Sequence, residues 1–367
     1  LSPLKGGLSV IPKHIHTFIP GICMFFFVRY CLHKKDLEVL LNLYIYTSIL
    51  IAFLYVYEWI NVNVLGNLMF SWVTKYNEDF GGAEQFLSQG TLGFHRLMGV
   101  IGYNHATGIF IAGALSIVYT KYQESVGKLN IPIMVLFFSA IFLTASRTAI
   151  LSILIIFLIN GSSRILRDKL KLLFMVFLFF SVSYFLYRNF IASAEITMLF
   201  KLLAGSFSGS DGGDASIWQV FANVFFRDIE QIMLIVKEYP LALLFGAGFP
   251  VYLQGQFLNP VLTNDTYFMM WITQYGLLGS LIMLVVLISV FNGLSRVIKL
   301  ASLAAHDKVI ALSTYRVLLI YLFSTVHSSS IQFYPIYFFF FAFLGLACHM
   351  IPNGVFNNSC DVKNIEC

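Results

Sequence analysis

The sequence is dominated by apolar runs, most of them long enough to cross a lipid bilayer. Nine such runs can be recognised, at Phe18–Leu32, Leu37–Ile60, Leu97–Thr120, Ile131–Ala145, Thr148–Asn160, Leu170–Phe190, Thr266–Phe291, Val309–Val326 and Ile331–Met350. A helix needs about 20 apolar residues to span the hydrocarbon core, and in lipid its backbone groups must bond within their own segment. With 58% hydrophobic and 11% charged residues, a soluble fold could not bury the apolar surface. We therefore expect an all-α polytopic membrane protein, a single membrane domain over residues 1–367.

The charged residues in the connections predict the orientation. Alternate connections carry most of the lysine and arginine: Lys34, Lys35, Lys121, Lys128, Arg164, Arg167, Lys169, Lys171, Arg296, Lys299 and Lys308. The other short connections carry only Lys75, Arg96 and Arg147. Because basic residues stay on the cytoplasmic side, the first set is expected inside. The net charge of +5 then reports orientation, and nucleic acid is not an expected partner. The chain begins at Leu1, so we expect the natural N-terminus, with room for a further span, upstream.

Residues 191–265 form the longest polar segment and are expected outside. Within it, apolar residues recur every three or four positions between Ser216 and Glu238, with polar residues on the opposite face. This spacing predicts an amphipathic helix, either a plain surface anchor or the roof of a cavity. The first outer loop contains Glu58, Glu78, Asp79 and Glu84, and we interpret these acidic residues as a solvated face.

Two neighbouring polar residues lie in the third run. If that run is one helix, His105 lies roughly 13 Å below Arg96 at 1.5 Å per residue. Polar side chains at such depth mark a pathway or a site, and Asn104 and His105 are candidate substrate-binding residues. The alternative is a pair of hydrogen bonds that only join helices.

Arginines on the outer side are a second candidate feature. Arg147 opens the fifth run, and Arg96 and Arg227 are expected on the same side. A guanidinium group suits bidentate binding of phosphate, so the three arginines would form a diphosphate site. The alternative for Arg147 is snorkelling to the lipid headgroups. The sequence carries no nucleotide-phosphate loop, zinc motif or serine-hydrolase elbow, and its five cysteines lack metal-ligand spacing. We therefore expect no metal and no cofactor.

The order of several short motifs resembles a known family. The motifs are Arg96-x-x-Gly99 followed by Asn104, then Ser146-Arg147-Thr148-Ala149, Arg227, Glu238-Tyr239-Pro240-Leu241, Phe245-Gly246-Ala247-Gly248, Asn264-Asp265-Thr266-Tyr267-Phe268 and Gly276-Leu277-Leu278-Gly279. From Arg96 to about Leu287 they are similar to the bacterial O-antigen polymerases and O-antigen ligases. Each motif consists of common residues, and their order around one outer loop carries the resemblance.

The resemblance implies a metal-independent, inverting glycosyltransferase of the bacterial inner membrane, with its site facing the periplasm. The donor would be an undecaprenyl-diphosphate-linked oligosaccharide, and a chain-length regulator protein is a possible partner besides the bilayer. Ligases carry His-Asn where this chain has Asn264-Asp265, which favours a polymerase. Asp265 and His327 are the candidate bases, each with a helix cap as its alternative role, and Asn264 and Tyr267 are expected to bind substrate.

Two other classes of function fit the same sequence. A transporter or flippase of lipid-linked oligosaccharide would also use outer arginines and a cavity. A non-catalytic assembly subunit would tolerate replacement of those arginines. The outcome of a transfer assay distinguishes all three.

Overall fold

The structure is a computed structural model that describes residues 19–65, 97, 99–101, 104–124, 131–144, 146–158, 226, 229–230, 232–237, 240–246, 251–253, 256–258, 267–300, 304–325 and 335–351. For Arg147 and Tyr267 it describes the backbone alone. The chain forms two compact units. The first consists of residues 1–48, 113–129 and 227–367, and the second of residues 49–112 and 130–226.

Long apolar helices dominate the described part of the chain. Three are long and apolar enough to cross a membrane: Leu37–Val62, Tyr275–Lys299 and Ala305–Thr325. They correspond to α3 (Leu37–Trp59) with the π-helical turn η3 (Ile60–Val64), to most of α14 (Tyr267–Lys299), and to α15 (Ala305–Thr325). Shorter apolar helices lie at Ile19–Cys31, Ile131–Leu143 and Ile336–Met350. The prediction of an α-helical membrane protein is confirmed at this level.

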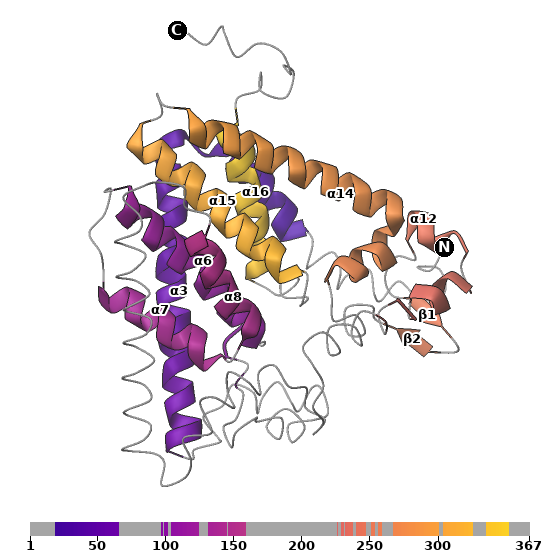
Figure 1. Cartoon of the computed structure of the whole chain (residues 1–367), viewed down its shortest axis with the longest axis horizontal. Coiled ribbons are helices and arrows are strands. Elements are labelled where there is room, and N and C mark those ends of the chain that lie inside the picture. The colour runs from indigo at the N-terminus through magenta and orange to yellow at the C-terminus, as the bar shows by residue number, and fades with distance from the viewer. Residues whose placement is uncertain are drawn as a thin grey trace, which may run out of the picture. The chain divides into compact units, whose positions relative to one another are not determined.

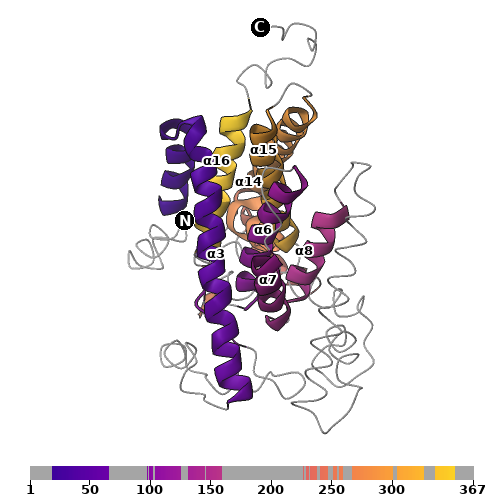
Figure 2. The same cartoon turned by 90° about the vertical axis from the view of Figure 1, so that its left-hand side faces the viewer.

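In the first unit, α14, α15 and α16 (Ile336–Met350) pack side by side (Figures 1 and 2), and the turn η1 (Phe27–Cys31) packs on α16. Tyr44 of α3 lies edge-on to the rings of Phe339 and Phe343. Its hydroxyl lies 2.6 Å from that of Tyr321 on α15. A hydrogen bond between two fully buried hydroxyl groups satisfies both without water.

The same unit contains a charged cluster, made of Glu38, Lys121, Glu124, His306, Lys308 and Arg316 with the polar residues around them. Lys121 donates to Glu38 at 3.1 Å, and Lys308 donates to Glu124 at 2.9 Å. Apart from Arg316, these residues come from the start of α3, the end of α6 (Asn104–Gln123) with the residue after it, and the start of α15. The charge pattern predicts that these three helix ends lie on the same, cytoplasmic side of the membrane, and the structure brings them together.

Arg316 is the most deeply buried member of the charged cluster, with 1% of its surface exposed. Its guanidinium group donates to the Thr120 hydroxyl and, at 2.8 Å, to the side-chain carbonyl of Gln123. It also lies over the ring of Tyr119, 5.6 Å from the centroid, a favourable cation–π distance. These contacts tie the middle of α15 to the last turns of α6.

Helix α14 is broken at Gly276, which has φ 69° and ψ 179°. Figure 1 shows the short first part of α14 at an angle to the long second part, with α12 (Ala242–Phe245) beside the break. A side chain at residue 276 would collide with the carbonyl of Leu244, and only glycine adopts this backbone conformation without strain. The bounds of the expected span Thr266–Phe291 are therefore wrong, because the helix that is long and apolar enough to cross a membrane runs from Tyr275 to Lys299.

A small hairpin lies between α12 and α14. Strands β1 (Val251–Leu253) and β2 (Gln256–Leu258) pair antiparallel, with Tyr252 opposite Phe257. The hairpin was not predicted from the sequence, and within the described ranges these are the strands that accompany the helices. The segment 191–265, which the charge pattern predicts outside, is otherwise described only in part.

The second unit contains the end of α3, the first half of α6, α7 (Ile131–Leu143) and α8 (Arg147–Leu158). The third predicted span, Leu97–Thr120, is wrong at its start. Gly99 has φ 66°, residues 99–101 form a turn, and α6 begins only at Asn104. Tyr55 of α3 fixes this turn by donating from its hydroxyl to the carbonyl of Leu97 at 3.0 Å. The predicted span 170–190 lies outside the described residues.

Candidate functional site

The connection between α7 and α8 is built by two hydroxyl residues. The Ser146 hydroxyl accepts a hydrogen bond from the backbone N–H of Ala149 at 3.2 Å, while its carbonyl accepts from Ile150 at 3.0 Å. This is the geometry of a serine N-cap, and it starts α8 at Arg147. The Thr144 hydroxyl in turn accepts from the N–H of Ser146 at 3.3 Å.

The first two residues of α6 bind to this connection. Asn104 donates from its side-chain amide to the carbonyl of Thr144 at 3.2 Å. His105 Nδ1 lies 3.0 Å from the Ser146 hydroxyl. We call Asn104, His105, Thr144, Ser146 and Thr148 the α6–α8 junction. The structure thus brings together two predicted substrate-binding residues and the backbone of the predicted anion-binding residue, Arg147.

The depth predicted for His105 is wrong. Because the chain turns at Gly99 and α6 starts at Asn104, His105 lies in the first turn of its helix, and no continuous helix separates it from Arg96 by roughly 13 Å. The alternative of helix-joining hydrogen bonds describes the observed contacts of both residues. Whether they also bind substrate stays a prediction.

Close packing holds the junction together. A Cβ atom at Gly108 would lie 2.8 Å from both the Ala149 Cβ and the Thr144 Oγ1. Real Cβ atoms do not approach neighbours this closely, so glycine at 108 lets α6 and α8 meet one turn beyond their first residues. The two helices therefore both begin at the junction.

This arrangement has the chemistry of an anion-binding site. The first N–H groups of a helix lack intrahelical partners, and the helix dipole adds a positive partial charge there. Thr148, 2% exposed, has a hydroxyl without a hydrogen-bond partner among the described residues. Two helix starts, a histidine and a spare hydroxyl lie close together, next to the backbone of an arginine.

The remaining predicted site residues lie outside what the structure describes. These are Arg96, Arg227, Asn264, Asp265 and His327, while Tyr267 is described only as the first residue of α14. Their roles as diphosphate ligands, substrate-binding groups and bases stay predictions. Among the described residues, no group of three or more His, Cys, Asp or Glu is placed to hold a metal ion.

The structure corrects the interpretation of Glu58. This residue was expected on a solvated face, but it is 1% exposed. The buried positions Ile51, Tyr55, Glu58 and Val62 of α3 and η3 recur every three or four residues, which places the carboxylate on the packed side of the helix. That spacing was available in the sequence and was the signal for its burial.

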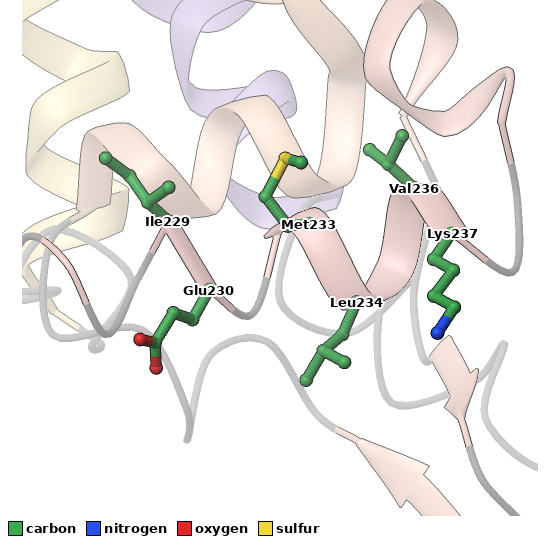
Figure 3. Close-up of a pocket in the computed structure, with 6 residues that line it drawn as sticks. All are labelled: Ile229, Glu230, Met233, Leu234, Val236 and Lys237. Atoms are coloured by element: carbon green, nitrogen blue, oxygen red, sulfur yellow. The ribbon is translucent and has the colours of Figure 1, made fainter.

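A separate open pocket of about 590 Å³ lies along residues 229–237. Figure 3 shows Ile229, Met233 and Val236 on one side of this helical segment and Glu230, Leu234 and Lys237 on the other. The described part of the predicted helix Ser216–Glu238 is thus helical. It is less amphipathic than predicted, because Met233 and Leu234 are exposed and Ile235 is buried. Among the described residues, this single helical segment walls the groove and does not enclose a substrate.

In comparisons with protein-family models, curated proteins and solved structures, nothing matches this chain.

Proposed function

We propose that this protein is a polysaccharide polymerase of the bacterial inner membrane that joins lipid-linked oligosaccharide units. In this proposal the chain has about nine spans, and residues 191–265 form a periplasmic loop over the site. The donor glycan is carried on undecaprenyl diphosphate, and the acceptor is the sugar of a second lipid-linked unit. Support comes from the motif order between Arg96 and about Leu287 and from the chemistry of the α6–α8 junction.

The observation that carries the proposal is the start of α8 at Arg147. Ser146 caps this helix, and its hydroxyl lies 3.0 Å from His105 Nδ1. A polymerisation step that uses no metal must stabilise a diphosphate leaving group by other means. Preorganised N–H groups, helix dipoles and guanidinium groups do so at the place where the negative charge develops. The junction supplies the first two, and Arg147 supplies the third from the first position of the helix.

In the proposed reaction, the acceptor hydroxyl oxygen attacks the anomeric carbon of the donor glycan. The bond from that carbon to the diphosphate oxygen breaks, and its electron pair leaves with the diphosphate. The hydroxyl proton passes to a base, for which Asp265 and His327 are candidates from the sequence. Arg96 and Arg227 are proposed to join Arg147 around the diphosphate.

The test is a polymerisation assay with purified protein in lipid vesicles and a labelled lipid-linked repeat unit. The wild type is expected to produce a ladder of longer glycans. Arg147→Ala loses two charge-assisted hydrogen bonds of about 1.5–3 kcal/mol each, so its rate is expected to fall roughly a hundredfold or more. Arg147→Lys keeps the charge without the planar fork and is expected to recover only part of the rate.

Arg296→Ala is the matched control, because Arg296 is exposed near the end of α14. It is expected to leave the ladder unchanged. Movement of the labelled lipid across the bilayer without elongation would identify a flippase. Transfer only to a lipid A–core acceptor would identify a ligase. Full polymerisation by Arg147→Ala would contradict the diphosphate site.

A further inference from the structure

Helix α3 carries one carboxylate at each end, and the two differ sharply in environment. Glu38, in the first turn, has a side chain that is 34% exposed and pairs with Lys121 at 3.1 Å. Glu58, in the last turn, is 1% exposed. Burial of a carboxylate costs several kcal/mol unless the charge is compensated. In membrane-spanning segments, such residues are typically retained for function.

The position of Glu58 relates it to the α6–α8 junction. Tyr55, one turn before it, and Val62, one turn after it, pack together with Leu97, and Leu143 packs against this group. Leu143 is the last residue of α7 and immediately precedes Thr144, which accepts the hydrogen bond from Asn104. The Leu97–Ile101 segment that Tyr55 holds leads directly into Asn104. Glu58 lies between Tyr55 and Val62 on the packed side of the helix, the side that contacts the segments leading into the junction. All of these residues belong to the second unit.

The chemistry of the two features is complementary. The junction consists of amide, imidazole and hydroxyl side chains at two helix starts, which favour negative charge. A glycosyl transfer needs a proton acceptor. The carboxylate on the packed side of α3 is an anionic one, a type of group that the junction side chains do not offer. General bases in enzymes are commonly carboxylates positioned by burial and neighbouring groups.

We propose that Glu58 is the general base of the transfer, a catalytic role that rests on the proposed function. The acceptor oxygen bonds to the anomeric carbon, the bond from that carbon to the diphosphate oxygen breaks, and the hydroxyl proton passes to the Glu58 carboxylate. The diphosphate leaves with the electron pair toward the starts of α6 and α8. Asp265 and His327 then act as substrate-binding or capping residues.

The experiment measures polymerisation by Glu58→Gln, Glu58→Asp and Glu38→Gln in lipid vesicles, with thermal unfolding of each purified variant. Removal of a general base lowers kcat by roughly 10²–10⁴-fold. Glu58→Gln is expected to show that loss, with KM for the lipid-linked donor within about threefold of wild type and a Tm no lower than that of wild type. Glu58→Asp keeps the carboxylate one methylene further back and should retain more activity than Glu58→Gln. Glu38→Gln makes the same change on the same helix and should leave kcat within about twofold.

Polymerisation at the wild-type rate by Glu58→Gln would overturn the proposal. So would parallel losses of donor binding and Tm, which would make Glu58 a structural partner. If Glu58→Gln does not fold, Glu58→Asp decides: a folded protein with kcat lowered at least about tenfold supports the base, and full activity excludes it. Failure of the wild type to elongate any lipid-linked unit would instead remove the proposed function, and the base with it.

Discussion

The charged cluster of the first unit and the α6–α8 junction of the second are both polar regions inside an apolar chain, yet they are built differently. In the charged cluster, both carboxylates are paired within the protein, as Lys121–Glu38 and Lys308–Glu124. The junction uses amide, imidazole and hydroxyl side chains and helix starts. A region whose carboxylates are already paired with lysines is suited to hold helices together. A region with positive helix ends and no carboxylate is suited to receive an anion from outside. Substitutions in the two regions should therefore separate stability from activity.

Arg316→Ala is expected to have the largest effect on stability. It removes a side chain that is 1% exposed and bonded to Gln123 at 2.8 Å, and large-to-small changes in a core cost about 2–5 kcal/mol. Arg316→Met keeps most of the volume and should recover part of that loss. Thermal unfolding in detergent measures both, and activity per folded molecule should be unchanged. A large loss of activity without a loss of stability would show that Arg316 acts in a functional site. The charged cluster and the junction would then not differ in role as described.

Gly108→Ala tests the packing of the junction. The added Cβ would lie 2.8 Å from the Ala149 Cβ, and overpacking of a core costs about 1–3 kcal/mol. Polymerisation should fall by more than the loss of stability explains, because α8 must shift. The double variant Gly108→Ala/Ala149→Gly removes one of the two clashing atoms. Its loss of stability should therefore be smaller than the sum of the losses in the two single variants. Additive effects would show that the two helices do not meet as described.

Ser146→Ala removes the N-cap of α8 and the partner of His105. Loss of a serine cap costs about 1 kcal/mol, so Tm should fall modestly while the rate of polymerisation falls more. Ser289→Ala is the control, because its hydroxyl bonds the Val285 carbonyl of its own helix. If Ser146→Ala and Ser289→Ala have equally small effects on Tm and on the rate, the junction only connects helices and has no part in the reaction.

Glu38→Gln should have the smallest effect. Its pair with Lys121 is partly exposed, with side chains 34% and 17% accessible, and such pairs contribute about 0–1 kcal/mol. The difference in Tm from wild type should shrink as salt is added, because screening weakens the wild-type pair. A salt-independent loss of several degrees would show that the charged cluster acts as one cooperative unit.

The sequence predicted the long helices well because their signal is apolar composition. The fourth and eighth spans were expected at Ile131–Ala145 and Val309–Val326, and the helices occupy Ile131–Leu143 and Ala305–Thr325. The start of α8 at Arg147 was predicted to within one residue, because the apolar run begins at Thr148. The breaks at Gly99 and Gly276 were missed. Glycine within an apolar run leaves hydropathy unchanged, and the positive φ depends on neighbours such as the Leu244 carbonyl.

The site was less predictable than the fold. Asn104 and His105 were selected as polar residues in an apolar run, but their partners Thr144 and Ser146 are about 40 residues away in the sequence. Such pairing depends on helix packing, which composition does not determine. Arg316 was not selected, although a charge in the middle of a predicted span is a strong signal.

The shortness of α7 has a consequence for the surrounding membrane. Pro132 fits only a first turn, and the helix ends at Leu143 after 13 residues, roughly 20 Å at 1.5 Å per residue. The hydrocarbon core is about 30 Å thick, and a hydrophobic segment that is too short is accommodated by a thinner bilayer beside it. A local depression of the lipid surface at the end of α7 would bring headgroups toward Thr144 and Ser146. Under the proposed function, and with α7 as a span, acyl-chain length would then control how readily the lipid-linked substrate reaches the junction.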